Sequence, residues 1–156
     1  MFLRVPGMVG TTMGIAMIIT TTLALADVTL PDEVVVENLR IEKSLSGSPG
    51  DAAQGRKTFA DRSLGNCLAC HLNSDLSDEL FHGNVGPSLD GVATRWKPEQ
   101  LRTIVVNAKK VFTERTIMPG FYSLDVGEDV REDLIGKTIL TAQQVEDVVA
   151  YLNTLE

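Results

Sequence analysis

The chain has 156 residues, a formal net charge of −7 and 44% hydrophobic residues. This length suits one domain with a tail, and the apolar fraction argues against a disordered chain. The acidic balance argues against nucleic acid as a partner, because phosphate binding relies on basic residues. Two cysteines only three positions apart argue against a disulfide-stabilised scaffold.

The first 26 residues have the pattern of a secretory signal peptide. Arg4 gives a basic start, an apolar stretch runs from about Met8 to Leu25, and small residues stand at Ala24 and Ala26. We expect cleavage after Ala26 and export, to the periplasm in a Gram-negative cell. The alternative is an uncleaved anchor helix, although glycines and threonines dilute the apolar stretch. No second long apolar run follows, so stable membrane insertion after cleavage is not expected.

Residues 27–50 contain two prolines and two glycines and are expected to form an N-terminal extension. The domain proper is expected over residues 51–156 and opens with a helix from Asp51 to about Arg62. Gly55 inside this helix costs about 1 kcal/mol relative to alanine. Close approach of a second helix is the gain that would offset this cost.

The pentapeptide Cys67-Leu68-Ala69-Cys70-His71 is typical of covalent haem attachment. Both thiols would form thioethers with the haem vinyl groups, and His71 would be the proximal axial ligand of the iron. A thioredoxin-like site would need a βαβ setting, and a zinc site would need four ligands. A plain disulfide does not account for His71. With both sulfurs bound no free thiol remains, so this chain is expected to perform no cysteine-based catalysis alone.

After the haem motif, residues 83–96 hold three glycines and a proline and are expected to form an ordered loop over the proximal side of the haem. Pro98 suits the first position of a helix. The apolar residues that follow it have helical spacing; they are Leu101, Ile104, Val105 and Ala108.

Met118 is the only methionine beyond the signal segment, and the Pro-Gly pair after it predicts a loop. Its thioether is the expected sixth ligand of the iron, and His/Met ligation raises the reduction potential. A methionine that merely fills a gap in the core is the alternative. Other rival ligands are His82, interpreted as a loop histidine, and Lys109 or Lys110, whose amine would have to be neutral.

The polar, acidic segment 121–140 is longer than a connection needs and suggests a partner-facing insertion. Thr141 and Gln144 then form a capping-box pattern, and apolar residues follow at helical spacing to Leu155. We expect this C-terminal helix to cross the first helix at Gly55. The predicted fold is therefore all-α, wrapped around one covalent haem that serves as part of the core.

Several short motifs stand in the order found in class I cytochromes c, and the chain resembles that family over about residues 51–156. The motifs are Gly55-xxx-Phe59, Cys67-xx-Cys70-His71, Gly86-Pro87-Ser88-Leu89, Met118-Pro119 and Tyr151-Leu152. The resemblance implies the class I cytochrome c fold, one haem c and His71/Met118 ligation. It also implies that the carbonyl of Pro87 accepts a hydrogen bond from His71, which orients the ring.

A narrower resemblance is to the SoxX family of monohaem cytochromes from bacterial thiosulfate oxidation. It rests on the blocks Lys43–Asp51, Gly65–His71, Gly83–Gly91 and Met118–Tyr122. This resemblance implies a heterodimer with a SoxA-type cytochrome, together forming an L-cysteine S-thiosulfotransferase. The pair couples thiosulfate to a cysteine of a SoxYZ-type carrier, and this chain would pass the electrons to a soluble cytochrome c. The lack of a free thiol agrees with a heterodimer, because the sulfur chemistry must then take place on a partner.

The site residues follow from these two resemblances. Cys67 and Cys70 hold the haem, His71 and Met118 ligate iron, and Pro87 supports His71. Trp96 and Arg95 are expected to contact a haem propionate, with core packing and a solvated charge as the alternatives. No residue of this chain is expected to be catalytic. Two other functions stay open: a free electron shuttle without an enzyme partner, and a ligand-binding or peroxidase-like haem protein, which needs an open sixth position.

Overall fold

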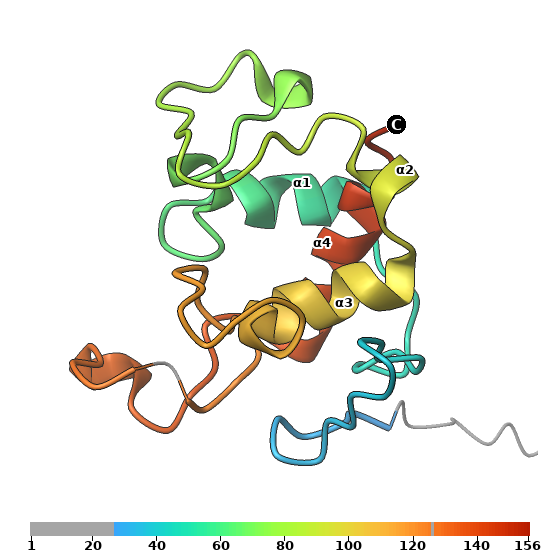
Figure 1. Ribbon diagram of the computed structural model, residues 1–156, viewed down its shortest axis with the longest axis vertical. Coiled ribbons are helices and arrows are strands. Elements are labelled where there is room, and N and C mark those ends of the chain that lie inside the picture. Colours follow the sequence, from blue (N-terminus) through green and yellow to red (C-terminus); the bar gives the residue numbers. More distant parts are fainter. Residues whose placement is uncertain (1–26, 126) are drawn as a thin grey trace, which may run out of the picture.

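Four α-helices form the frame of the chain in a computed structural model that describes residues 27–125 and 127–156 (Figure 1). They are α1 (Ala52–Ala60), α2 (Val92–Arg95), α3 (Pro98–Asn107) and α4 (Ala142–Leu152). Short 3₁₀ helices lie at Cys67–Ala69, Ser74–Leu76, Ala108–Lys110 and Glu132–Leu134. The described residues form no sheet, only an isolated bridge between Glu37 and Arg40, so the all-α prediction is confirmed. The predicted signal peptide lies outside the described residues, and no helix within them has the length and apolarity to cross a membrane.

Helices α1 and α4 cross at Gly55, as the sequence predicts. A Cβ atom on Gly55 would lie 1.9 Å from the carbonyl oxygen of Asp147 and 2.8 Å from the Cβ of Tyr151. Only a residue without a side chain lets the two backbones approach this closely. Beside the crossing, the rings of Phe59 and Tyr151 pack edge to face with their centroids 5.5 Å apart. Helix α4 contacts both α1 and α3, and Figure 1 shows the three helices gathered in the middle of the molecule.

Side-chain caps fix where the long helices begin. Asp51 accepts hydrogen bonds from the N–H groups of Ala53 and Gln54, at 2.8 and 3.2 Å. Thr141 and Gln144 form the predicted capping box, each accepting the other's backbone N–H, at 3.2 and 2.9 Å. These bonds satisfy donors that a helix leaves free in its first turn. Helix α3 starts with Pro98 in its first turn, also as predicted.

The prediction of a loop over residues 83–96 is wrong at its end, where Val92–Arg95 forms α2. Gly91 precedes the helix with a φ of +65°, a left-handed conformation that suits glycine. Val92, which is 3% exposed, then joins the core, and this burial stabilises a helix too short to show a periodic pattern.

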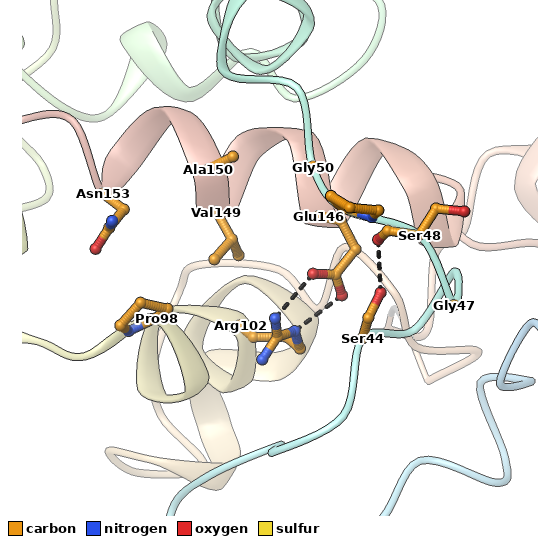
Figure 2. Close-up of a pocket in the computed structure, with 11 residues that line it drawn as sticks. Ser44, Gly47, Ser48, Gly50, Pro98, Arg102, Glu146, Val149, Ala150 and Asn153 are labelled. Atoms are coloured by element: carbon orange, nitrogen blue, oxygen red, sulfur yellow. Dashed lines mark hydrogen bonds and ion pairs between the residues drawn. The ribbon is translucent and has the colours of Figure 1, made fainter.

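Residues 27–50 pack against α3 and α4 around a buried ion pair. Arg102 donates through Nε and a terminal nitrogen to the two carboxylate oxygens of Glu146, at 2.8 and 2.9 Å. Glu146 also accepts the N–H of Leu45 at 2.8 Å, and Arg102 donates to the carbonyl of Ile41 at 2.7 Å. The two side chains are only 11% and 4% exposed, and Figure 2 shows them at the wall of a pocket of about 440 Å³. The extension therefore completes the hydrogen bonding that a buried pair requires.

Candidate functional site

A cavity of about 800 Å³ brings together the haem-attachment pentapeptide and the Met118 loop. Cys67, Cys70, His71 and Met118 all line it, although Met118 comes from a loop far along the chain. The volume lies in the range of protein sites for cofactors and small molecules. Apolar side chains from α3 and its surroundings, among them Leu101, complete the wall.

The attachment motif sits on a tight turn in the wall of this cavity. Asn66 has a left-handed backbone with a φ of 47°, and the 3₁₀ helix Cys67–Ala69 follows it directly. The N–H groups of Cys70 and His71 both donate to the carbonyl of Cys67, at 3.1 and 2.9 Å. The turn thus holds both sulfurs beside one cavity. Burial raises the pKa of the Cys67 thiol to about 12, so this thiol is protonated at neutral pH before attachment.

The backbone of the loop around Pro87 holds the His71 ring in a fixed orientation. Its Nδ1 lies 2.7 Å from the carbonyl oxygen of Pro87, and because a carbonyl only accepts, Nδ1 carries the proton. The lone pair of Nε2 is then left for iron. Gly86 lies directly against the ring, since a Cβ there would be 2.3 Å from the His71 Cε1. Its N–H donates to the carbonyl of Cys70 at 2.8 Å, which ties the loop to the attachment turn.

Arg95 braces the same loop. Its guanidinium donates to the carbonyls of Asp90 and Ser88, at 2.7 and 2.8 Å, while the residue also lines the cavity. Asp90 in turn accepts hydrogen bonds from the N–H and the hydroxyl of Ser74, both at 2.8 Å. These two bonds, the backbone one first, hold the pKa of Asp90 below its usual value. No sequence pattern marks bonds of this kind, because backbone carbonyls are present at every residue.

Trp96 follows α2 and lies half-buried in the cavity wall. Its ring packs edge to face against Phe112, with the centroids 5.9 Å apart. An aromatic pair of this geometry contributes about 1 kcal/mol beyond its buried area. Trp96 therefore packs against a neighbouring ring, as the core-packing alternative expects. This packing does not prevent its indole N–H from contacting a bound group.

Met118 lies on a loop, as the Pro-Gly pair predicts, and packs partly buried against the core. The loop returns to α3 through two backbone hydrogen bonds, from Phe121 to Val105 and from Tyr122 to Val106, both at 3.2 Å. On the other side of Met118, the Lys109 amine donates to the carbonyl of Thr116 at 2.9 Å. Lys109 is therefore engaged within the protein, a role that the sequence did not suggest.

His82 is used elsewhere. Its Nδ1 accepts the N–H of Asn73 at 3.3 Å, and its Nε2 donates to the carbonyl of Leu76 at 3.0 Å. With both ring nitrogens bound inside the 73–82 segment, and with no place in the cavity wall, His82 is a structural loop histidine. Of the candidate iron ligands, His71 and Met118 therefore share the cavity and His82 does not.

The charge of the cavity wall differs from that of the whole chain. Among the described residues that line it there is no carboxylate, although the chain has 21 acidic residues. Four arginines do line it: Arg62, Arg95, Arg115 and Arg131. Guanidinium groups suit carboxylates such as the two propionates of a haem. Apolar volume, paired thiols, an oriented imidazole, a thioether and these arginines together fit a covalent haem.

Comparison with known proteins agrees with the geometry. The family model described as Cytochrome c matches residues 52–156. A chain in a crystal structure of SoxXA from P. pantotrophus is 44% identical, with a TM-score of 0.76, over 83% of this chain and 98% of that chain. No curated protein matches this sequence. The chain therefore belongs to the cytochrome c family, within its SoxX branch, and carries one covalent haem c.

Proposed function

We propose that the chain is the electron-transfer subunit of a periplasmic SoxAX-type L-cysteine S-thiosulfotransferase. The observation that carries this proposal is the match to SoxXA, which covers 98% of that chain and 83% of this one. A coverage of 83% exceeds the segment 52–156, so the likeness includes part of the extension as well as the general cytochrome domain. The expected export signal agrees with a periplasmic enzyme, because c-type haem is attached outside the cytoplasm.

The distribution of sulfur in the chain supports a partner. Both of its cysteines belong to the haem motif, so no thiol is left to carry a sulfur substrate. Joining thiosulfate to a carrier thiol forms one S–S bond and releases two electrons and one proton. That bond would form on the SoxYZ-type carrier and the SoxA-type subunit, while this chain would receive the electrons and deliver them to a soluble cytochrome c. The chain is not expected to be catalytic by itself.

The residues of the cavity have defined tasks in this proposal. Cys67 and Cys70 would hold the haem through thioethers, and His71 and Met118 would supply the nitrogen and sulfur ligands of its iron. Haem c supplies a one-electron couple between ferric and ferrous iron. The Pro87 carbonyl keeps the His71 proton on Nδ1 and makes Nε2 a stronger electron-pair donor to the iron. Apolar residues exclude water from the cavity, and Trp96 and Arg95 would contact a propionate.

A ligand-binding or peroxidase-like haem protein is a poorer fit. Such a function needs an open sixth position, whereas Met118 lines the same cavity as His71, and its loop is tied to α3 on one side and to the 3₁₀ helix Ala108–Lys110 on the other. The acidic segment 121–140 is proposed to face a partner, and Arg131 and Leu134 connect it to the cavity wall.

The test is copurification from the native host, followed by a gel stained for covalent haem. A tagged mature chain should bring down a second haem-staining polypeptide at equal stoichiometry. The isolated pair should then reduce its haem when thiosulfate and the thiol form of the carrier are added together, but not with either alone. A single haem band at the mass of the mature chain, with no thiosulfate-dependent reduction, would instead identify a free electron shuttle. A Cys67→Ala variant, which should lose most covalent haem, controls the stain.

A further inference from the structure

The Lys109 side chain reaches the loop that carries Met118. Its amine donates to the carbonyl of Thr116 at 2.9 Å, and Thr116 stands two residues before Met118. Thr116 and Met118 both line the cavity, and the Lys109 side chain is itself partly buried. An ammonium group has three donors and no acceptor, so the direction of this bond is certain.

Buried neighbouring residues fix the backbone of Lys109. Helix α3 ends at Asn107, and the 3₁₀ helix Ala108–Lys110 continues from it. Asn107 is 8% exposed, and its side-chain oxygen accepts the N–H of Lys109 at 3.1 Å. Ala108 is fully buried. Lys109 therefore starts from a rigid point, and its long side chain spans the gap to the loop.

The two arms of the Met118 loop are held differently. The arm after Met118 has two backbone bonds to α3, through Phe121 and Tyr122, both at 3.2 Å. The arm before it has local bonds, such as the one from the Thr116 N–H to the Thr113 carbonyl at 2.9 Å. Ile117 is 78% exposed and gives this arm no hydrophobic anchor. The Lys109 bond is the hydrogen bond that joins Thr116 to the end of α3.

We propose that Lys109 is a positioning residue for the Met118 thioether. By tying Thr116 to the end of α3, it limits how far the loop can swing from the cavity, and it thereby keeps the sixth position closed to outside ligands. The inference rests on the proposed ligation by Met118. It does not assign Lys109 to the iron, the role for which its amine would have to be neutral.

Lys110 provides a matched control. It stands in the same 3₁₀ helix and carries the same charge, but it is exposed. Lys109→Met and Lys110→Met remove one charge each from nearly the same place, so any general electrostatic effect on the haem is common to both. Lys109→Arg keeps a charged donor and should restore much of the tether. Lys109→Gln is a second variant, should the methionine variant fail to fold.

The experiment measures capture of imidazole by the ferric haem-loaded protein, together with the methionine-to-iron charge-transfer band. At high imidazole the capture rate reaches the rate at which Met118 leaves the iron. A hydrogen bond from a charged donor is strong enough that its loss should raise that rate about tenfold in Lys109→Met. The charge-transfer band should weaken in parallel, while Lys110→Met should match the wild type and Lys109→Arg should lie close to it.

Two results would overturn the proposal, and they are distinguishable. If Met118→Ala leaves the band and the capture rate unchanged, Met118 is not the ligand, and the tether loses its purpose. If Met118→Ala opens the iron but Lys109→Met and Lys110→Met behave alike, the ligation stands and the role of Lys109 alone is refuted.

Discussion

Replacing Gly55 by alanine tests the helix crossing on which the whole fold depends. The new methyl group would lie 1.9 Å from the Asp147 carbonyl oxygen and 2.4 Å from its carbonyl carbon. Both atoms belong to the backbone of α4, so no side-chain rotation can relieve the contact. Contacts of carbon with carbonyl oxygen need more than 3 Å, and the two helices must therefore separate by about 1 Å or more.

The expected cost follows from two opposing effects. Alanine favours the helical backbone over glycine by about 1 kcal/mol. Overpacking a close interior contact costs about 1–3 kcal/mol and more where the backbone must shift. Separation also loosens the Phe59–Tyr151 pair, which is almost fully buried at the same crossing. We expect Gly55→Ala to lower the free energy of unfolding by about 2 kcal/mol, the upper overpacking cost less the gain in helix propensity.

Guanidinium chloride unfolding of the haem-loaded protein, followed by circular dichroism, measures this change. Gln54, the exposed residue directly before Gly55, supplies the control, because the stabilities of Gln54→Ala and Gln54→Gly differ only through helix propensity. Their difference should be near 1 kcal/mol in favour of alanine. If Gly55→Ala is also stabilising, the close crossing does not exist and the reasoning from Gly55 is wrong.

Three other perturbations test separate parts of the structure. Gly86→Ala should push the loop from the His71 ring and break the Pro87 bond; the weaker imidazole donor then stabilises ferric iron less, so the reduction potential measured by redox titration should rise, while Gln54→Ala, at an exposed position outside the cavity wall, is the control. Glu146→Gln should cost about 3 kcal/mol in chemical unfolding, because it leaves the charge of Arg102 buried without its partner, whereas replacing both by apolar residues should recover most of the loss. Tyr151→Phe should cost about 1–2 kcal/mol, since the phenol bonds Asn73 and Asp75 at 2.9 and 2.7 Å. Burial, and then donation to Asp75, raise the pKa of Tyr151, so its contribution is full below about pH 10 and is lost as the pH rises further; the variant should show a smaller loss of stability over that alkaline range.

The sequence predicts those parts of the fold in which chemistry demands a residue type at a fixed spacing. The attachment pentapeptide, the Thr141 capping box, Pro98 in the first turn of α3 and the close-packed Gly55 are all of this kind. Each is a local pattern whose physical meaning does not depend on the rest of the chain. The three longer helices and their crossing could therefore be predicted before any coordinates.

The parts that escaped prediction depend on long-range contacts or on backbone acceptors. Glu146 is 44 positions from Arg102, its ion-pair partner, and 101 from Leu45, whose N–H it accepts, and no local pattern indicates either contact. Helix α2 has only four residues, fewer than a periodic pattern needs. Lys109 and Arg95 both donate to carbonyl oxygens, which every residue carries and which leave no trace in a sequence. The sequence therefore predicts a ligand, a propionate contact or a solvated surface charge at these positions, whereas in the structure both side chains hold loops in place.

The hydrogen bond from Leu45 in the extension to Glu146 in α4 joins two segments that are made far apart in time during synthesis. A ribosome that adds about 5–20 residues per second needs roughly 5–20 seconds to pass from Leu45 to Glu146. Throughout that interval the extension has been made, but the carboxylate that binds it has not. The haem motif is likewise complete long before α4 can close against α1. A chain that stops short of Ala142 would therefore contain the whole extension but lack the helix that holds it, because the extension depends on α4, which is made about 100 residues later.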